Sequence, residues 1–532
     1  MAEPLDPNMR LQRALVVGGG VAGLVAARDL ARVGVEVTVI DVGDRPGGQV
    51  RREIVAGLPV EVGAESFALR GGAVEELIRE LGLTDELRSP NPRGAWLRLP
   101  EGSEPGAVPI PAGGILGIPS NPFAPEVRAV IGWSGVWRAY LDRIRPVLSR
   151  GQERNLGEFV RRRLGARVRD RLVAPVTRGV YSMAPEQIDL EVAAPGLNRG
   201  LVRAGSLTGA VALLRADAVP GAPVRSIVGG MSVLVTALVA DIEAHGGRVL
   251  SGHEALALRG SADVVADLAD LDEEELDPVV RDSQRALLAD IDALPAPGWV
   301  LDVQPASAEE AVVRHVADVV LLAGAEDSSR HLLHTAGVDL PRVRPTPESE
   351  PRIDVVTLVV DQPDLDAAPR GSGLLVVEGA PVLAKALTHA TAKWSWLGEH
   401  AGRSNPHRHV LRLSYGGHGI PSVAAELADE DLTRIALRDA ADLLGIPLNA
   451  AHLRGSHRTV WQPTRPVAAL GQAEHAAGLR AVAAALPGLD VAGAWVAGTG
   501  LAAVVPDALA SSQRLRREIV ERYVEGGVTP EG

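Results

Sequence analysis

The chain has 532 residues, a formal net charge of −13 and no cysteine. Apolar residues make up 46% and charged residues 23%, which is ordinary for a globular protein long enough for two large domains. The absence of cysteine excludes disulfides, thiolate catalysis and zinc sites with cysteine ligands. The acidic balance without a basic stripe argues against nucleic acid as a partner. No apolar run reaches the length of a transmembrane segment, so a cytoplasmic protein is expected.

A strand, a glycine turn and a helix are predicted at the start of the chain. The apolar run at 14–17 is followed by the spacing G-x-G-x-x-G, a helical run at 24–33, and a β-branched strand at 35–40 that ends in an acid. The three glycines allow a tight turn, close approach of a pyrophosphate, and close packing of helix on sheet. The helix N-terminus then faces the phosphates, and the acid binds a ribose hydroxyl. The predicted dinucleotide-binding residues of this unit are Gly18, Gly20, Val21, Ala22, Gly23 and Asp41.

The following loop favours FAD over NAD. In the run Asp44-Arg-Pro-Gly-Gly48, Arg45 can neutralise a phosphate, and Gly47 and Gly48 let the chain pass close under a flavin. The run 59–67 then indicates another strand that ends in a turn of small residues. This succession resembles the FAD-containing amine oxidase superfamily. Two ordinary loops are the alternative interpretation.

The order of patterns along the chain predicts an α/β protein with two interleaved parts. Segments 1–105, 226–345 and 456–532 are expected to build a Rossmann-like FAD-binding domain. Segments 106–225 and 346–455 are expected to build an inserted α+β substrate domain, with a helical lobe and an antiparallel sheet. The acidic segment 259–297 is interpreted as a surface helical insertion, with a docking surface as the alternative.

Individual elements follow from periodicity and from glycine or proline at their ends. A glycine pair, a helix and a strand are expected over 229–250. The predicted helices are 73–81, 136–148, 156–164, 166–173, 429–444 and 508–523. The predicted strands are 317–324, 353–361, 373–378 and 410–415.

Lysine is almost absent from this sequence. Of the 54 basic residues only Lys385 and Lys393 are lysines, and they lie in one short segment. A chain that accepts arginine nearly everywhere indicates a need for lysine at these two positions, with chance as the alternative.

Several segments together resemble the oxygen-dependent protoporphyrinogen/coproporphyrinogen oxidases of haem synthesis. The similar runs are 110–119, 164–181, 371–376 and 386–394, and the resemblance extends over 14–258 and 311–520. The sequence departs from the family in the tract 462–466 after Trp461, and in Gln49, which follows the glycine pair where Arg, Lys or Trp is commoner.

The resemblance implies an FAD-dependent oxidase that converts a porphyrinogen to a porphyrin in three two-electron steps and passes the electrons to molecular oxygen. Coproporphyrinogen is the preferred substrate, because the lysine-tryptophan run resembles the bacterial members that are not membrane-bound. Peripheral contact with a membrane and docking of another haem-pathway enzyme on 259–297 stay open. The alternatives are an amine or polyene oxidase of the same superfamily, and an FAD-binding protein without turnover.

The substrate's propionates call for cations in the pocket, for which arginine is best suited. Arg70 is the first choice and Arg178 the second, and Lys393 is expected over the flavin or at a propionate; a surface position is the alternative for each. Tyr181 and Trp394 are expected to wall the macrocycle, with a core position as the alternative. Near the flavin, the resemblance also places Trp461, Gly498 and Gly500. The 13 histidines show no metal-binding spacing, so no metal is expected.

Overall fold

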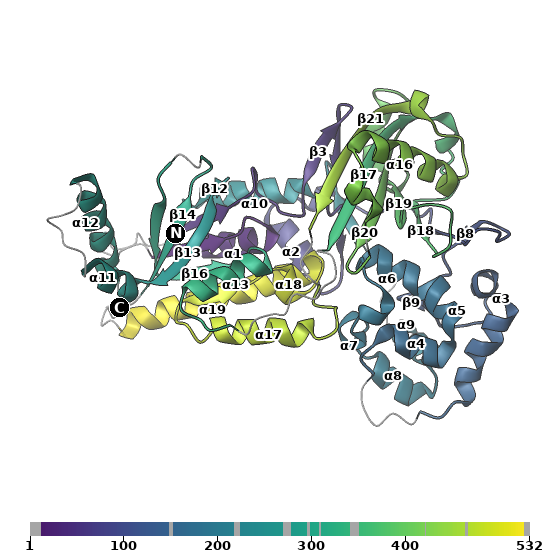
Figure 1. The fold of residues 1–532 in the computed structure, drawn as a ribbon, viewed down its shortest axis with the longest axis horizontal. Coiled ribbons are helices and arrows are strands. Elements are labelled where there is room, and N and C mark those ends of the chain that lie inside the picture. The colour runs from purple at the N-terminus through teal and green to yellow at the C-terminus, as the bar shows by residue number, and fades with distance from the viewer. Residues whose placement is uncertain are drawn as a thin grey trace.

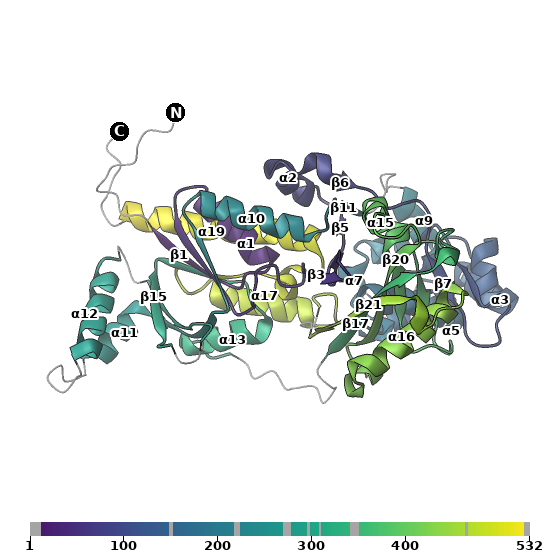
Figure 2. The ribbon, with the colours of Figure 1, turned by 90° about the horizontal axis from the view of Figure 1, so that it is seen from above.

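The structure is a computed structural model that describes residues 12–147, 153–216, 224–269, 278–294, 298–307, 310–340, 351–420, 422–462 and 466–525. It is elongated, with a parallel sheet and its helices at one end of the long axis and a second sheet beside a group of helices at the other (Figures 1 and 2). The mixed α/β fold matches the fold class expected from the sequence. Each end of the molecule draws its elements from separated parts of the chain.

The first sheet has five parallel strands in the order β12-β2-β1-β16-β22. Its strands are β1 (Arg13–Val17), β2 (Glu36–Asp41), β12 (Arg248–Ser251), β16 (Val319–Leu322) and β22 (Leu489–Val491). Every strand but β12 has a nearly continuous apolar, buried run, as expected for a parallel sheet covered on both faces. The predicted strands at 14–17, 35–40 and 317–324 all belong to this sheet.

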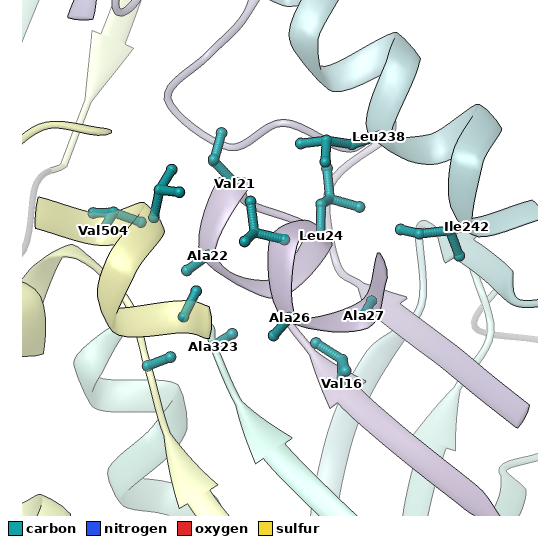
Figure 3. Packing of buried hydrophobic residues seen from close by; sticks show 14 of the residues in the cluster. Val16, Val21, Ala22, Leu24, Ala26, Ala27, Leu238, Ile242, Ala323 and Val504 are labelled. Carbon is teal, nitrogen blue, oxygen red and sulfur yellow. The ribbon is translucent and has the colours of Figure 1, made fainter. Parts of the chain in front are cut away.

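Alternate residues of β1 face opposite layers. Val16 packs against helices α1 (Val21–Ala31), α10 (Ser232–Ala244) and α19 (Leu501–Glu525), and Figure 3 shows α1 between Leu238 of α10 and Val504 of α19. Leu15 and Val17 belong to the opposite cluster. That layer is formed by β13 (Glu254–Gly260), β14 (Trp299–Gln304), β15 (Val313–Ala317), α13 (Glu326–Thr335) and α17 (Gln472–Ala483).

The acidic segment forms two helices, as predicted. They are α11 (Ser261–Ala269) and α12 (Pro278–Asp292), and residues 270–277 and 295–297 between and after them lie outside the described residues. Val264, Leu287 and Ile291 are buried against Val300 and Val316 of the antiparallel strands. One face of the insertion therefore has a core of its own, and its acidic residues lie on the other.

The second sheet has seven strands in the order β21-β17-β20-β19-β18-β7-β8 and is antiparallel except between β18 and β7. Its strands are β7 (Trp96–Arg98), β8 (Ala107–Pro109), β17 (Arg352–Asp361), β18 (Gly373–Val376), β19 (Ala386–His389), β20 (Arg408–Gly417) and β21 (Leu453–Trp461). On one face Leu358 packs against α16 (Asp429–Leu444). On the other, Val359 packs against α14 (Ala390–Lys393), α15 (Ser395–Gly402) and the hairpin β3 (Arg52–Val55) and β4 (Leu58–Glu61).

Seven helices form the group beside the second sheet, around a separate hydrophobic cluster. They are α3 (Pro125–Tyr140), α4 (Leu156–Leu164), α5 (Ala166–Val168), α6 (Ala174–Val180), α7 (Leu190–Ala193), α8 (Leu197–Ala204) and α9 (Leu207–Ala216). The helix predicted at 136–148 is wrong, because α3 begins at Pro125 and ends at Tyr140. Gly132 interrupts α3 with φ of 66°, which hid its first half from a periodicity argument. The predicted helix 166–173 continues past its expected end through a π-helical turn into α6.

Small elements complete the structure. They are β5 (Phe67–Ala68), β6 (Leu87–Arg88), β9 (Gly114–Ile115), β10 (Ile118–Pro119), β11 (Val224–Ile227), α2 (Ala73–Glu80) and α18 (Ala494–Ala497), and short 3₁₀ turns at 84–86, 141–144, 185–187, 363–365, 423–426 and 450–452. Among the described helices, none combines the length and the apolar character needed to cross a bilayer.

The domain boundaries expected at 105 and 456 do not coincide with the points where the chain passes between the two sheets. β7 lies within 1–105 and β21 extends past 456, yet both belong to the second sheet. The chain therefore crosses to the second sheet before Trp96 and leaves it after Trp461. The last helix was also predicted too short, because α19 begins at Leu501 and continues through Pro506.

Leu24 offers a test of the packing around α1. Its side chain is completely buried in the cluster of Figure 3, so Leu24→Ala removes packed methyl groups and leaves a cavity. We expect the free energy of unfolding to fall by about 2–5 kcal/mol, measured by denaturant titration. The matched control is Val33→Ala, whose side chain is exposed and should change stability by no more than about 0.5 kcal/mol. Equal effects of the two changes would contradict this packing.

Candidate functional site

The three predicted glycines of the first turn serve two different purposes. A Cβ on Gly18 would fall 2.6 Å from the carbonyl carbon of Ala323, and one on Gly23 would fall 2.0 Å from the carbonyl oxygen of Gly18. These two glycines are therefore required by the protein's own backbone packing. A Cβ on Gly20 would meet no atom within 4 Å. The open space over Gly20 fits the close approach of a ligand rather than of another chain segment.

The N-terminus of α1 presents unpaired backbone donors beside that space. Gly20 is the N-cap residue, no side chain caps the helix, and its first turn contains no acidic residue. The first N–H groups of a helix have no partner inside the helix and carry partial positive charge. Val21 and Ala22, whose side chains are buried, provide the first of these N–H groups. A pyrophosphate fits this helix end.

Asp41 lies beside the glycine turn, as predicted. It ends β2, and its carboxylate is so close to Gly19 that a Cβ there would meet Oδ2 at 2.7 Å. Burial raises the pKa of Asp41 above its usual value, against the backbone hydrogen bonds of Gly19 and Gly43, which favour the ionised form. An acceptor of this kind next to the helix N-terminus fits a ribose hydroxyl of a dinucleotide.

The loop after β2 returns to the turn. The amide of Gly47 donates to the carbonyl of Gly19 at 2.8 Å, and Gly47 pairs with Gly20 in a parallel bridge. Gly47 has φ of 122°, and a Cβ on it would fall 2.5 Å from the carbonyl oxygen of Val50. Gly48 lies directly over Gly20, where a Cβ would be 3.4 Å from its Cα. The two glycine motifs therefore form one surface.

Arg45 stands apart from that surface. Its guanidinium forms an ion pair with Glu53, and 44% of its side chain is exposed. It borders a separate hollow between the loop and α10. The expected contact of Arg45 with a cofactor phosphate stays a prediction.

A cavity of about 260 Å³ lies where the first sheet's segments meet the second sheet. Gln49, Gly63, Ala64 and Thr499 line it from the side of the glycine motifs. From the opposite side it is lined by Val180, Tyr181, Ser182, Ile353, Val355, Arg412 and His418. The cavity thus joins the dinucleotide surface to the second sheet, the place where a flavin ring and a substrate can meet.

Three further predicted residues lie at this junction. Trp461 lines the cavity, and its indole N–H donates to the carbonyl of Val62 at 3.2 Å. Gly498 and Gly500, with φ of 110° and 95°, flank the cavity residue Thr499 directly before α19 begins. A second helix N-terminus, that of α19, therefore lies beside the cavity.

Lys393 and Arg412 together hold a buried carboxylate. Lys393 forms an ion pair with Oε1 of Glu65, and Arg412 Nη1 lies 3.1 Å from Oε2. Burial opposes ionisation of Glu65, but the two cations outweigh it and lower the pKa of the carboxyl below its usual value. Arg412 also donates to the carbonyl of Gly63 at 2.9 Å. This trio, the Glu65 triad, fixes the small-residue turn at 63–66 against the second sheet.

The two aromatic residues predicted to contact the macrocycle, Tyr181 and Trp394, lie in different places. Tyr181 lines the cavity, and burial raises the pKa of its phenol, opposed by the nearby charge of Arg70. Trp394 is 2% exposed in the cluster between the hairpin β3–β4 and the second sheet, and it does not line the cavity. The ammonium of Lys393 lies 5.2 Å from its ring centroid. We assign Trp394 a packing role beside the Glu65 triad.

The two predicted arginines, Arg70 and Arg178, differ in whether the guanidinium forms an ion pair. Arg178 is 2.9 Å from Glu378 in an ion pair. Arg70 is exposed, and no ion pair of its guanidinium is found within the described part of the chain; its electrostatic neighbour is Tyr181. Arg70 is therefore the better placed of the two to take a carboxylate at the cavity.

Sequence reasoning missed several residues in and beside the cavity. The sequence placed Glu65 only within the strand and turn at 59–67, and no local pattern distinguished Arg412, Ser182 and His418. Glu65 and Arg412 are separated by 347 positions, so no local spacing could have paired them. The only signal was the scarcity of lysine, which pointed to the segment that contains Lys385 and Lys393.

Gly20 gives a direct test of the dinucleotide surface. Gly20→Ala should leave the fold intact, because its methyl group enters open space. With FAD passing close to Gly20, overpacking costs about 1–3 kcal/mol, which weakens FAD binding about 10–100-fold. Binding is measured by flavin fluorescence during titration of the FAD-free protein. Gly478→Ala, in α17 and also in open space, is the control and should bind FAD normally. Normal binding by both variants would place the cofactor elsewhere.

Comparison with known proteins agrees with this geometry. Residues 21–280 match the family described as flavin containing amine oxidoreductase. The coproporphyrinogen III oxidase of Mycobacterium leprae is 28% identical, over 95% of this chain and 98% of its own length. That of Propionibacterium freudenreichii is 26% identical, over 95% and 90%.

Solved structures share the fold. A putative protoporphyrinogen oxidase from Exiguobacterium sp. 255-15 superposes with a TM-score of 0.73 at 23% identity, over 96% of this chain and all of that one. A putrescine oxidase superposes with a TM-score of 0.60 at 16% identity, over 96% and 99%. The family match over residues 21–280 and the relatives of similar length support an oxidoreductase whose cofactor is FAD.

Proposed function

We propose that this protein oxidises coproporphyrinogen III to the corresponding porphyrin in haem biosynthesis, using molecular oxygen as the final acceptor. The supporting observation is the cavity between the FAD surface and the second sheet, in a chain that resembles coproporphyrinogen III oxidases over nearly its whole length. Protoporphyrinogen IX is the second substrate candidate, since a chloroplastic protoporphyrinogen oxidase from rice is 33% identical over 36% of this chain.

The proposed division of labour follows the two sheets. The segments around the first sheet hold FAD, with Gly20 and the N-terminus of α1 at the pyrophosphate and Asp41 at a ribose hydroxyl. The second sheet and the helical group enclose the substrate. FAD when bound accepts two electrons and a hydrogen in each step and passes the electrons to oxygen. The protein's own task is to orient the macrocycle, hold its carboxylates and remove protons.

Each residue at the cavity then has a task. Tyr181 and Trp461 offer aromatic surfaces to a flat macrocycle. The Glu65 triad positions the turn at 63–66 beside the flavin region, because Arg412 comes from β20 of the second sheet and Lys393 from α14, which packs on that sheet. Arg70 takes a propionate at the cavity edge, where a guanidinium binds a carboxylate through two parallel hydrogen bonds.

The assay that tests the function compares two porphyrinogens in air. Purified protein with bound FAD should produce porphyrin fluorescence from coproporphyrinogen III faster than an enzyme-free control, and from protoporphyrinogen IX more slowly. Oxidation of neither substrate, with FAD bound, would refute the proposal. Oxidation of a primary amine or a polyene instead would assign the protein another reaction of the superfamily. Oxidation of none of these substrates would indicate a protein that binds FAD without enzymatic activity.

Arg70 provides the substrate test. Arg70→Ala removes a charge-assisted hydrogen bond worth about 1.5–3 kcal/mol, so KM for coproporphyrinogen III should rise about 10–100-fold with little change in kcat. Protoporphyrinogen IX, which has fewer propionates, should be affected less. Arg434→Ala, an exposed arginine paired with Asp431 on α16, is the control and should leave both constants unchanged. An unchanged KM in Arg70→Ala would show that another cation binds the propionates.

We also propose peripheral contact with an anionic membrane through an aromatic patch on and beside α3. The patch consists of the exposed residues Phe123, Trp133, Trp137, Tyr140, Leu141 and Ile144. Aromatic side chains are only 3% of the sequence, yet four of them gather here. Arg128 lies over the ring of Trp133 at 4.8 Å, and Arg143 over Tyr140 at 6.0 Å. Aromatic and basic groups on one exposed helix suit the boundary between lipid headgroups and acyl chains.

A vesicle experiment tests the patch. The double change Trp133→Ser and Trp137→Ser removes two exposed indoles, each worth about 1.5 kcal/mol on burial, so cosedimentation with phosphatidylglycerol vesicles should weaken more than tenfold. Raised salt should weaken the wild type's binding as well, because the arginines are screened. Val520→Ser, an exposed apolar residue on α19, is the control. Equal vesicle binding by wild type and double variant would refute the contact.

For another haem-pathway enzyme, we propose the acidic outer face of α11 and α12 as the docking site. Its described acidic residues are exposed and are Asp263, Asp267, Asp282, Asp290 and Asp292.

A further inference from the structure

Lys385 is a largely buried lysine whose ammonium group touches the wall of the cavity from behind. It directly precedes β19, and its Nζ lies 2.7 Å from Oγ of Ser182 and 2.7 Å from the carbonyl oxygen of Gly416. Ser182 lines the cavity. A hydroxyl group is thus the link between the lysine and the substrate space.

The choice of lysine at this position is informative. Only two of the chain's 54 basic residues are lysines, and both lie near the cavity. Arginine keeps its proton under all ordinary conditions, whereas a buried lysine can release it. Lys393 is paired with the carboxylate of Glu65. Lys385 forms no ion pair with any described residue, and its recorded partners are a hydroxyl and a carbonyl. Neither of these described partners is a carboxylate that would hold the lysine in its charged form.

Ser182 is held in place by its backbone. Its φ of 54° is in the left-handed region, which costs a residue other than glycine about 1–3 kcal/mol and persists only where neighbouring structure enforces it. The amide of His418 donates to the carbonyl of Ser182 at 2.8 Å, and a Cβ on Gly417 would fall 2.4 Å from that oxygen. The end of β20 therefore pins the serine between lysine and cavity.

The hydrogen-bond chemistry of this pair has two states. An ammonium group only donates, so when Lys385 is charged Ser182 Oγ accepts from it and directs its own proton elsewhere. When the lysine is neutral, its nitrogen accepts the proton of Ser182, and Oγ is free to accept a proton from the cavity. Burial lowers the pKa of Lys385 to about 7, so both states are populated near neutral pH.

Other ionisable groups lie on the elements packed around Lys385. Within the described residues these are Tyr181 beside Ser182, Tyr415 and His418 on and after β20, and the ion pair of Arg178 with Glu378. Asp439 of α16 accepts from the amides of Leu383 and Ala384 at 3.0 Å each. Of these, His418 is the group whose ordinary titration range also includes neutral pH, so it must be separated from Lys385 by experiment.

We propose that Ser182 and Lys385 form a proton relay that receives the proton leaving the substrate during oxidation. The relay rests on the proposed function. In each step the substrate loses a hydride from a bridging carbon to the two-electron acceptor FAD. In two of the three steps it also loses a proton from a pyrrole nitrogen: the N–H electron pair stays on that nitrogen as an imine lone pair, and the nitrogen's π lone pair enters the new conjugated double bond. In the remaining step the proton comes from the fourth bridging carbon, and the C–H electron pair enters the conjugated system. The proton bonds to Oγ of Ser182 as the serine's own proton passes to the neutral amine of Lys385, and the resulting ammonium releases it to water before the next step.

Lysine NMR tests the relay without any turnover. Protein labelled with ¹³C and ¹⁵N in lysine should show two side-chain signals, and the one missing from Lys385→Arg belongs to Lys385. We expect this signal in FAD-loaded protein to titrate with a midpoint near 7. In Ser182→Gly, which removes the hydroxyl and tolerates the left-handed backbone, the midpoint should fall, because the ammonium loses an acceptor. A midpoint near 10.4, the ordinary value for lysine, would overturn the relay.

Kinetics provide the second readout. The rate of flavin reduction by coproporphyrinogen III should fall about tenfold per pH unit below the lysine midpoint, because the charged lysine cannot accept a proton. Lys385→Arg and Ser182→Gly should each lower that rate about 100-fold with KM little changed, whereas His418→Gln should keep the pH dependence. Rescue by arginine would overturn the relay, since arginine reproduces the charge but cannot accept a proton.

The two proposals fail in distinguishable ways. If wild-type protein with bound FAD oxidises neither porphyrinogen, the proposed function fails, and the relay is judged on the lysine midpoint and its shift in Ser182→Gly alone. If the porphyrinogen is oxidised but the pH dependence is lost only in His418→Gln, the function stands and the relay is refuted.

Discussion

The close approach of α1 to β1 is the constraint on which the rest of the structure depends. Gly23 brings the helix so near the strand that a Cβ would overlap the carbonyl of Gly18, and this contact directs the helix N-terminus at the open space over Gly20. Helices α10 and α19 pack on either side of α1 (Figure 3). A dinucleotide surface made of backbone requires this rigidity, because backbone donors cannot rotate to find their ligand as side chains do.

A substrate site between the two sheets also requires that their relative position is fixed beside the cavity. The Glu65 triad does this with charge, because Glu65 lies in the turn after β4, whereas Arg412 lies on β20 of the second sheet and Lys393 ends α14 on that sheet. Loss of Glu65 would leave two largely buried cations without their carboxylate, which is destabilising. The indole of Trp461 adds a neutral link to the carbonyl of Val62. These contacts tie the two sheets together beside the cavity.

Local sequence patterns were sufficient to predict the glycine turn between β1 and α1, but not the contacts that join the two sheets. The glycine turn, Asp41 and the helix at 429–444 depend on neighbours within a few dozen residues, and the sequence predicted them correctly. The Glu65 triad depends on residues more than 300 positions apart, and no periodicity carries that information. The domain boundary expected at 456 cuts through β21 for the same reason, because the sequence of a strand does not identify the strand with which it pairs. Gly132 shows the converse error, in which a local breaker hides a helix that tertiary packing stabilises.

The scarcity of lysine is a feature of the composition that the structure explains at one of its two positions. An arginine would satisfy a structural ion pair as well as a lysine does, and usually better, since its planar fork forms two hydrogen bonds. At Lys393 the structure shows a charge pair with Glu65, and the ring of Trp394 lies beside the ammonium. At Lys385 the partners are neutral and the site is largely buried, so a permanent charge would be costly there. The one property that lysine has and arginine lacks is a proton that it can give up, and the structure places that property behind a serine at the cavity wall.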